Sequence, residues 1–436
     1  MNKSSVIGKI SIAGDLVLKS PLLIGDGAGE TPDNFRDVHV LKNRAGAPFI
    51  PGTSICGVLR DWIENFALDA VTKIFGDNDK MQSSIQFDDI ALADCEIISR
   101  DGVRIDGATG TGVDGGKYDF EVVERGAKGS LKLLITLRGC HSTEKISNVV
   151  ASMLKKLQDG IRLGAMTSKG FGLVAGENLT ANLYDFRDKN DVAAWLTDKP
   201  SAKKIAPAID MNSAADNDFV VDAEFIFNSS FIIRDYDATE KLKDTTVTAA
   251  TLKSRKDFVI PGTSLKGILR HRAEYIFERL ALDKNFLEDL MGTSNKKSRF
   301  IVAESYVAPK NFSEFAHTRN KIDRLTGGTL QGTLFTTKPA YQKNFDEPTL
   351  KIHFEIRNAK LFEAGLALFL LRDLWLGRVA IGGEKSIGRG TVKGQSAEIN
   401  FKGKTYKLDA NGKISDATDL EQFAEALKNF SGGVDK

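Results

Sequence analysis

The chain has 436 residues, 42% of them hydrophobic and 27% charged, which excludes a disordered or fibrous protein and predicts a globular one of two domains. Lys and Arg number 60 and Asp and Glu 58, so the formal charge is only +2 and any affinity for a polyanion must come from local patches. Three cysteines without CxxC spacing, and no apolar run near the ~20 residues of a membrane helix, argue against a disulfide framework and a membrane partner and favour a soluble, cytoplasmic protein.

The first predicted elements are a strand and a helix joined by a polar loop. Residues 9–18 alternate polar and apolar side chains, as a half-buried strand does. The phrase IPGTSICGVLR at residues 50–60 starts the helix, and Thr53 or Ser54 is expected to be its N-cap. Apolar residues at helical spacing continue it, namely Ile55, Val58, Leu59, Trp62, Ile63 and Phe66.

Two strands, a second helix and a last strand complete the first half. The two strands are predicted at residues 84–92 and 131–137, and the helix follows from an apolar stripe that ends at Gly160. A glycine-rich turn, GAMTSKGFG at residues 164–172, leads into the last strand at residues 171–184. The order strand, helix, two strands, helix, strand is typical of the split βαβ, or ferredoxin-like, plan.

The second half repeats this plan. The phrase returns as IPGTSLKGILR at residues 260–270, with eight of eleven positions identical. Three further landmarks recur in the same order, at offsets of 216 to 218 residues: Gly76 with Gly292, Asp106 with Asp323, and Gly170 with Gly388. Such regularity indicates a duplication. We therefore expect an α+β protein with a first domain at residues 1–190, a linker at 191–217, a second domain at 218–407 and a tail helix at 408–436.

The repeated phrase is a candidate anion site, because a helix N-terminus offers free amides and a favourable dipole to a phosphate. A plain capped helix would explain the hydroxyl residues alone. Both copies also keep an arginine and two glycines, and the second glycine costs roughly 0.8–1 kcal/mol of helix stability. The candidate binding residues are Gly52, Thr53, Ser54 and Arg60 in the first copy and Gly262, Thr263, Ser264, Lys266 and Arg270 in the second.

The glycine-rich turns GAMTSKGFG and GGEKSIGRG are a second candidate anion site. Glycines at the first, seventh and ninth positions of both suggest loops whose amides face a ligand, although tight packing would require the same glycines. No Gly-Lys-Ser/Thr opens a following helix, so neither turn is a nucleotide-binding P-loop. The candidates here are Lys169, Gly170, Gly172, Lys385, Gly388, Arg389 and Gly390.

Polar segments rich in glycine and threonine, at residues 104–123 and 319–339, are long enough to protrude as hairpins. Aromatic side chains in them could stack on nucleobases or simply pack within the hairpins; these are Tyr118, Phe120 and Phe335. The second hairpin lies in the more basic half of the chain and adds two candidate binding residues, Arg319 and Arg324.

Residues for metal binding or nucleophilic catalysis are sparse. The five histidines have no zinc-like spacing, and neither a nucleophile elbow nor an HExxH motif occurs. The one acid-rich stretch is the loop before the first phrase, with Asp26, Glu30, Asp33 and Asp37. Loop carboxylates mostly face solvent or form turns, but these precede a candidate phosphate site.

This series of motifs, from the loop with an aspartate through IPGTSxxGxLR and IDxxTG to a terminal GxxxxxGxG, resembles the repeat-associated mysterious protein (RAMP) superfamily. It is most similar to the backbone subunits of type III CRISPR effector complexes, which serve antiviral defence, and two copies in one chain resemble the fused double subunit of III-D variants. The likeness covers residues 7–185 and 218–403. It implies two tandem ferredoxin-like, RRM-like domains that bind CRISPR guide RNA, thumb hairpins that enter the duplex of guide and single-stranded target RNA, and other effector subunits as partners.

The resemblance also implies cleavage. In that family an aspartate in the loop before the proline-glycine phrase promotes metal-dependent cutting of target RNA, which assigns this role to Asp37, with Asp33 in reserve and Mg²⁺ or Mn²⁺ as the cofactor. The second copy departs from the pattern, because its matching position is near Val247 and Asp244 fits only with a shifted gap. Two alternatives stay open: an RNA-binding scaffold without catalysis, and a guide-processing endoribonuclease that uses His39 as its base.

Overall fold

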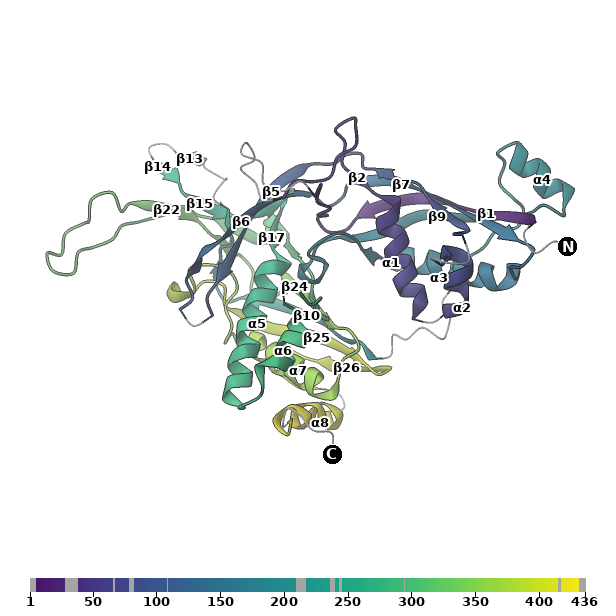
Figure 1. Cartoon of the computed structure of the whole chain (residues 1–436). Coiled ribbons are helices and arrows are strands. Elements are labelled where there is room, and N and C mark those ends of the chain that lie inside the picture. The colour runs from purple at the N-terminus through teal and green to yellow at the C-terminus, as the bar shows by residue number, and fades with distance from the viewer. Residues whose placement is uncertain are drawn as a thin grey trace. The chain divides into compact units, whose positions relative to one another are not determined.

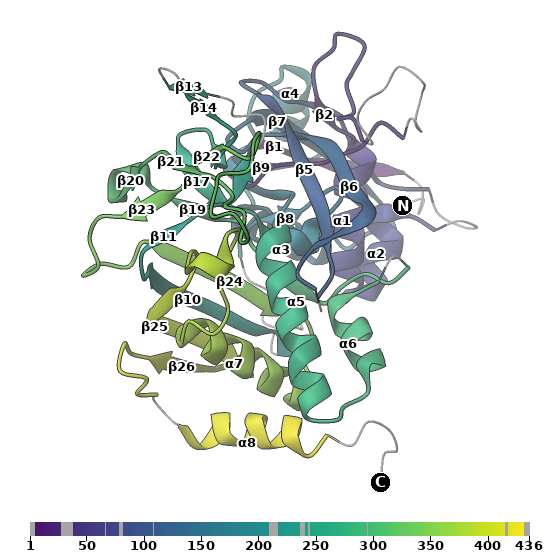
Figure 2. The ribbon, with the colours of Figure 1, turned by 90° about the vertical axis from the view of Figure 1, so that its left-hand side faces the viewer.

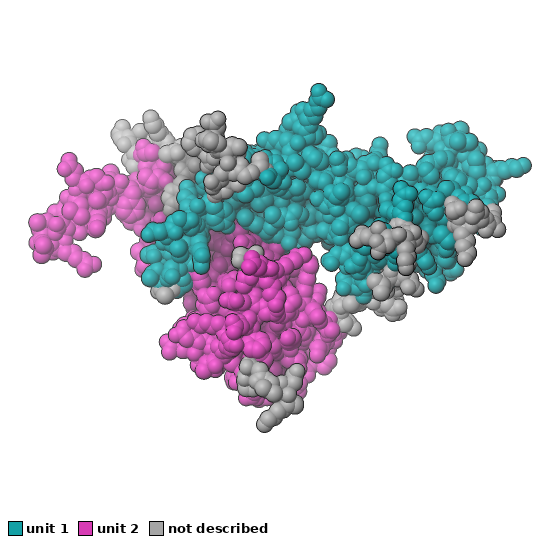
Figure 3. All heavy atoms as spheres, in the orientation of Figure 1, with its two compact units in different colours: residues 1–167, 171–214 teal, residues 168–170, 215–436 magenta. Residues whose placement is uncertain are grey.

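The computed structural model describes residues 5–27, 38–65, 67–77, 82–107, 109–208, 217–235, 240–242, 245–293, 295–414 and 417–430. The chain divides into two compact units (Figure 3): residues 1–167 and 171–214 form unit 1, and residues 168–170 and 215–436 form unit 2. Each unit combines helices with a sheet, as the sequence predicts.

The sheet of unit 1 is antiparallel, and its central strand is β1 (Val6–Leu18) (Figure 1). Ile10, Ile12 and Leu16 point to its buried face, as the alternation of the sequence predicts. The spatial order is β3 (Ile85–Phe87), β7 (Lys128–Arg138), β1, β9 (Leu173–Asp185) and β8 (Ile161–Arg162).

The helices of unit 1 contribute apolar side chains to the same core. In α1 (Gly52–Glu64) the buried residues Ile55, Leu59 and Ile63 recur every fourth position, as predicted. The predicted N-cap is wrong: the helix begins at Gly52, so Pro51 takes the cap position and no side chain caps the helix. The other helices of this unit are α2 (Leu68–Phe75), α3 (Thr143–Asp159) and α4 (Lys189–Leu196).

Part of the stretch predicted to be a linker is folded onto unit 1. Asp188 caps α4 by accepting a hydrogen bond from the Asn190 amide. The buried carboxylate of Asp191 accepts from the Asp185 amide at 2.9 Å and from Lys203 Nζ at 2.8 Å, which ties the helix to the last strand of the sheet. Polar side chains that look like a linker in the sequence therefore hold a short helix in place.

The first four strands of the sheet of unit 2 repeat the order found in unit 1, whereas the fifth strand precedes its neighbour in the sequence of unit 1 and follows it in unit 2. Its strands are β18 (Phe300–Val302), β24 (Leu350–Ile356), β10 (Phe219–Phe227), β25 (Val392–Phe401) and β26 (Lys404–Leu408), in spatial order and antiparallel. Its helices are α5 (Gly262–Arg279), α6 (Lys284–Met291), α7 (Leu361–Trp375) and α8 (Ala417–Lys428). Figure 2 shows α8 beside α7, where Gly365 allows the close approach because a Cβ there would lie 2.1 Å from the Phe423 carbonyl oxygen.

Hairpins and short strands complete both units. In unit 1 the predicted hairpin is formed by β5 (Ile97–Ile105) and β6 (Gly112–Val123), and β2 (Phe49–Ile50) pairs with β4 (Ile90–Ala91). In unit 2 the predicted hairpin is formed by β21 (His317–Arg319) and β22 (Phe335–Lys338). The remaining short strands of unit 2 are β11 (Ser230–Phe231), β12 (Arg234–Asp235), β13 (Glu240–Leu242), β14 (Thr245–Val247), β15 (Ala249–Thr251), β16 (Lys253–Ser254), β17 (Asp257–Ile260), β19 (Ser305–Val307), β20 (Phe312–Glu314) and β23 (Ala340–Gln342).

Among the described residues, no helix combines the length and the apolar composition needed to span a bilayer.

Candidate nucleic-acid interface

The start of α1 already holds a carboxylate. Asp89 Oδ1 accepts a hydrogen bond from the Gly52 amide at 2.8 Å, so this amide of unit 1 is occupied. Thr53 is exposed in the first turn, beside the less exposed Ser54, and the exposed side chain of Arg60 pairs with Glu64 at 3.0 Å. The first copy of the phrase therefore offers hydroxyls but only part of the expected amide cluster.

The start of α5 differs, because its first amides are not occupied by any carboxylate that the structure describes. Among the described residues, the amides of Gly262 and Thr263 have no acceptor, and the Ser264 amide closes a turn on Pro261. Within unit 2 the backbone of Lys169 lies against this helix start, and a Cβ on Gly262 would come within 2.2 Å of the Lys169 carbonyl oxygen. The glycine is therefore required by close packing.

Three cations gather at this helix start. Buried Lys266 Nζ donates to Ser168 Oγ at 3.0 Å, to Ser298 Oγ at 2.7 Å and to the Phe300 carbonyl at 2.8 Å. Burial first, and then the nearby charges of Lys169 and Arg270, lower the pKa of Lys266 to about 7. Its counterpart in the first copy is Cys56, whose pKa burial raises against the opposing charge of Arg60.

Internal contacts leave one of these cations available to a ligand. Arg270 donates to the Gly292 carbonyl at 2.9 Å, at the end of α6, and to Glu274 at 3.2 Å. Burial, and secondarily Arg270, lower the pKa of Lys169, and its ammonium has no partner within the described parts of the chain. Lys266 and Arg270 hold the helix in place, whereas Lys169 can meet a phosphate.

The repeated IDxxTG motif forms the tip of each hairpin. In unit 1 the Asp106 amide donates to the Thr111 carbonyl, and Asp106 Oδ1 accepts from the Thr109 amide at 2.7 Å. In unit 2 the Asp323 amide donates to Gly328 in the same way, and Oδ1 accepts from the amides of Leu325 and Thr326. The aspartate thus closes an Asx-type turn, a structural role that its spacing alone did not reveal.

The hairpin tip of unit 2 exposes one basic and one apolar side chain. Leu325 is 97% exposed and its neighbour Arg324 is also exposed.

In the hairpin of unit 1, one of the aromatic residues considered for base stacking is buried. Phe120 is only 2% exposed and packs against Phe171 and Tyr118, so its interpretation as a base-stacking residue is wrong.

Packing explains the first and the ninth glycine of each glycine-rich turn. A Cβ on Gly164 would lie 2.3 Å from the Leu23 carbonyl oxygen, and one on Gly382 would lie 2.3 Å from that of Ile232. A Cβ on Gly172 would lie 1.9 Å from the Leu163 carbonyl oxygen, and one on Gly390 would lie 1.9 Å from that of Ile381. Gly388 is different, because it has a φ of +84° with open space around it. Gly170, at φ +95°, lies against the backbone of Glu304. The amide of Gly388 nevertheless donates to the Lys385 carbonyl at 3.0 Å, so it closes the turn and does not face a ligand.

The glycine-rich turn of unit 2 carries a buried ionic centre at Glu384. Arg319 Nη2 donates to Glu384 Oε2 at 2.5 Å and Arg389 Nε donates to the same oxygen at 2.8 Å, while Arg234 lies 3.5 Å from Oε1. Burial would raise the pKa of Glu384, but the hydrogen bonds from Arg319 and Arg389 outweigh it and the pKa is lowered. The first copy has Met166 at this position, with the same φ of 55°.

The sequence predicts Arg319 and Arg389 as site residues but not the carboxylate that holds them. Glu384 has the apolar Met166 as its counterpart, and the two turns share only three glycines and one serine, so the repeat does not mark it. The neighbouring Lys385 is exposed, its pKa is lowered by partial desolvation, and it has no partner in the described part of the chain. Lys385 is therefore the second cation, with Lys169, that stays available beside a glycine-rich turn.

The candidate catalytic residues Asp33, Asp37 and Asp244 lie outside the described residues. Among the residues that are described, no group of three or more His, Cys, Asp or Glu side chains could hold a metal ion. The alternative base His39 lies 3.3 Å from Glu121, measured from Nδ1 to Oε2.

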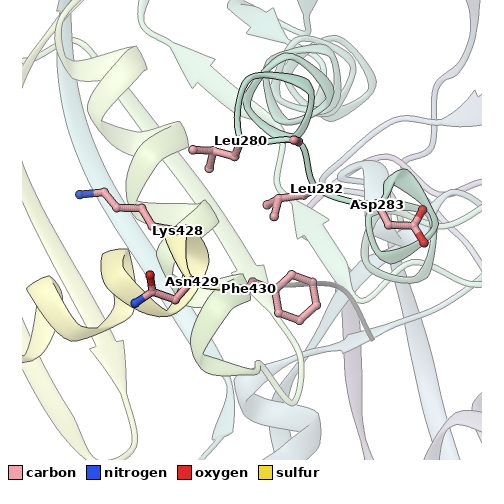
Figure 4. Close-up of a pocket in the computed structure, with 7 residues that line it drawn as sticks. Leu280, Leu282, Asp283, Lys428, Asn429 and Phe430 are labelled. Atoms are coloured by element: carbon pink, nitrogen blue, oxygen red, sulfur yellow. The ribbon is translucent and has the colours of Figure 1, made fainter. Parts of the chain in front are cut away.

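A cavity of about 320 Å³ lies between the α5–α6 connection and the end of α8 (Figure 4). It is lined by Leu280, Ala281, Leu282, Asp283, Lys428, Asn429 and Phe430. None of the predicted site residues borders it, so it is separate from the candidate interface.

Comparison with known families agrees with the duplication. The family model described as the RAMP superfamily matches residues 15–175 and 240–393, one stretch in each repeat and together more than half of the chain. No curated protein matches the chain.

Proposed function

The chain belongs to the RAMP superfamily, a membership that suggests a CRISPR-associated RNA-binding subunit, and on this premise we propose that it is a backbone subunit that holds guide RNA on two fused RAMP domains. The observation that carries the proposal is the family match in both repeats. The specific form proposed is the fused double subunit of a type III effector complex, with guide RNA, target RNA and neighbouring effector subunits as partners.

The arrangement of each unit supports this proposal. The orders β3-β7-β1-β9 and β18-β24-β10-β25 are those expected if each domain is ferredoxin-like. In unit 2 the unpaired amides of Gly262 and Thr263 and the ammonium of Lys169 offer a phosphate both a helix N-terminus and a cation. The hairpins with closed tips supply the protruding elements expected to reach the bases.

RNA binding is tested with the purified full chain and a labelled single-stranded RNA. Affinity should fall with salt by roughly 0.7 log units per log unit of salt for each neutralised phosphate. Lys169→Ala should reduce that slope by about one phosphate, whereas Arg60→Ala, which removes a cation already paired with Glu64, should change it less. Absence of RNA binding, or a flat salt dependence, would contradict the proposal.

Target cleavage is a further part of the proposal and rests on the family resemblance alone. A single loop carboxylate such as Asp37 can orient the 2′-OH of a splayed nucleotide for attack on its own phosphate, which predicts slow cutting at spaced sites. Asp37→Ala should abolish one cut in the assembled complex and leave guide binding intact, and a chelator should have the same effect as the substitution. Unchanged cutting in Asp37→Ala would favour a non-catalytic scaffold.

A further inference from the structure

An aromatic and arginine-containing strip runs along the hairpin base of unit 2. It comprises Phe315, His317, Arg319, Phe335, Tyr341 and Arg389. Phe315 is 56% exposed and Phe335 is 39% exposed. Strands β20 to β23 carry or flank all of these residues except Arg389. They are neighbours in Figure 2, where β20 pairs with β23 and β21 pairs with β22.

The members of the strip touch one another in sequence. The ring of Phe315 meets the edge of Tyr341 at 5.7 Å between centroids, and His317 stacks on Tyr341 at 5.5 Å. At the other end Arg319 lies over the ring of Phe335, 5.2 Å from its centroid. The two ends are linked through Arg389, which bonds to Tyr341 and, by way of Glu384, to Arg319.

Hydrogen bonds fix the middle of the strip. Arg389 Nη1 donates to the Tyr341 hydroxyl at 2.9 Å, so that hydroxyl is left to donate its own proton to His317 Nε2, also at 2.9 Å. Arg389 and Arg319 are both anchored on Glu384. Such a surface loses little side-chain freedom when a ligand binds, which favours affinity.

The strip is also positively charged. The two guanidinium groups of the strip, those of Arg319 and Arg389, are both anchored on the single carboxylate of Glu384, so these two cations share one anion. Exposed aromatic faces beside fixed cations are the combination that single-stranded nucleic acids require, because bases stack on the rings and phosphates meet the charge. An isolated exposed Phe would not carry this argument, since such residues are common on surfaces.

Unit 1 has different residues at the matching positions. At the offset of 217 residues that relates Asp106 to Asp323, Arg319 and Phe335 match Gly102 and Tyr118, which also pair across their hairpin. The Tyr118 ring lies over Gly102, where a Cβ would come within 2.2 Å of it, and the position of Arg389 is taken by the buried Phe171. Unit 1 therefore keeps an aromatic ring on its hairpin but has neither of the two arginines.

We propose that this strip binds unpaired nucleobases of RNA, which stack on Phe315 and on Phe335, and that unit 1 lacks such a site. The proposal rests on the RNA-binding function proposed above and adds a site for bases to it. Recognition would be independent of base identity, because every base has a stacking face and the strip's hydrogen-bonding groups are largely used internally.

The test uses the full chain and a short fluorescein-labelled oligouridylate, with binding followed by fluorescence anisotropy across a range of salt. Phe315→Ala should weaken binding roughly 5-fold or more, as expected for the loss of one stacked base. The slope of log affinity against log salt should stay as in the wild type, because no phosphate contact is lost. Phe315→Trp should restore affinity, whereas Phe315→Leu, which keeps an apolar side chain, should not.

Tyr275→Ala is the matched control. Tyr275 is an exposed aromatic residue on α5 that lies between Arg272 and Arg279, so it shares the chemistry of the strip but not its position. An oligonucleotide with abasic sites should bind the wild type and Phe315→Ala equally. Tyr275→Ala should bind the oligouridylate as the wild type does. If the wild type binds RNA but Phe315→Ala loses no more affinity than Tyr275→Ala, the strip is not a base site. If the wild type does not bind RNA, the function proposed for the chain fails as well.

Discussion

Replacing Glu384 with glutamine should destabilise unit 2 by about 2–4 kcal/mol. The carboxylate is buried and accepts hydrogen bonds from Arg319 and Arg389 at 2.5 and 2.8 Å. A hydrogen bond to a charged group contributes about 1.5–3 kcal/mol and a neutral one about 1 kcal/mol, so neutralising the shared acceptor weakens both. Leaving the arginines without a countercharge in a buried setting places the loss in the upper part of that range.

Urea denaturation of the full chain, followed by circular dichroism, measures this loss, and hydrogen exchange at β21 and β22 assigns it to unit 2. Glu347→Gln, at an exposed position, is the control and should change the free energy of unfolding by less than about 0.5 kcal/mol. A loss no larger than that of the control would refute the idea that Glu384 anchors the hairpin base.

The pH dependence gives an independent check. The arginines hold the pKa of Glu384 below its usual 4.5 against the opposing effect of burial. The carboxylate therefore stabilises the folded state fully above pH of about 4.5, and this contribution is lost as the pH falls through the lower folded-state pKa. The stability difference between the wild type and Glu384→Gln should shrink in that acid range, and a difference that is constant with pH would contradict the assignment.

Three further outcomes are expected. The pKa of Lys266 is lowered from 10.5 to about 7, so between these pH values the folded state binds fewer protons than the unfolded state. The free energy of unfolding of the wild type should therefore rise with pH in this window. Lys266→Met should flatten that rise in urea titrations. Gly390→Ala should lower stability by ~1–3 kcal/mol in thermal unfolding, because its φ is +77° and the carbonyl of Ile381 leaves no room for a Cβ. Gly412→Ala is the control and should cost less, because Gly412 has a similar φ but open space around it. Asp323→Ala should speed hydrogen exchange of the Leu325 and Thr326 amides, which lose their acceptor, and unchanged protection would show that the tip closes without it.

Periodic patterns predicted the framework well. The alternation in β1 and the apolar stripe of α1 depend on neighbouring residues only, and the same spacing of landmarks in both halves indicated the duplication before any contact was known. The N-cap prediction failed for a local reason, because Pro51 is already fixed near φ −60° and the helix can begin directly after it.

The site was harder to predict because its residues meet only after folding. Phe120 looks available in the sequence, but Phe171, about fifty residues later, covers its ring. Glu384 receives its partners from separate strands, among them Arg319 of β21 and Arg234 of β12. No spacing rule in one chain relates these positions, so the sequence could identify the cations but not which of them are already neutralised.

The closed hairpin tips have a consequence for how the two copies could diverge. Asp106 and Asp323 close their turns on backbone groups and on the threonine of the motif, so the side chains directly after each aspartate are not needed for the turn. The first copy continues with Gly107 and the second with Arg324 and Leu325. After duplication, selection was therefore free to change what each tip offers to a partner while the shape that presents it was inherited intact.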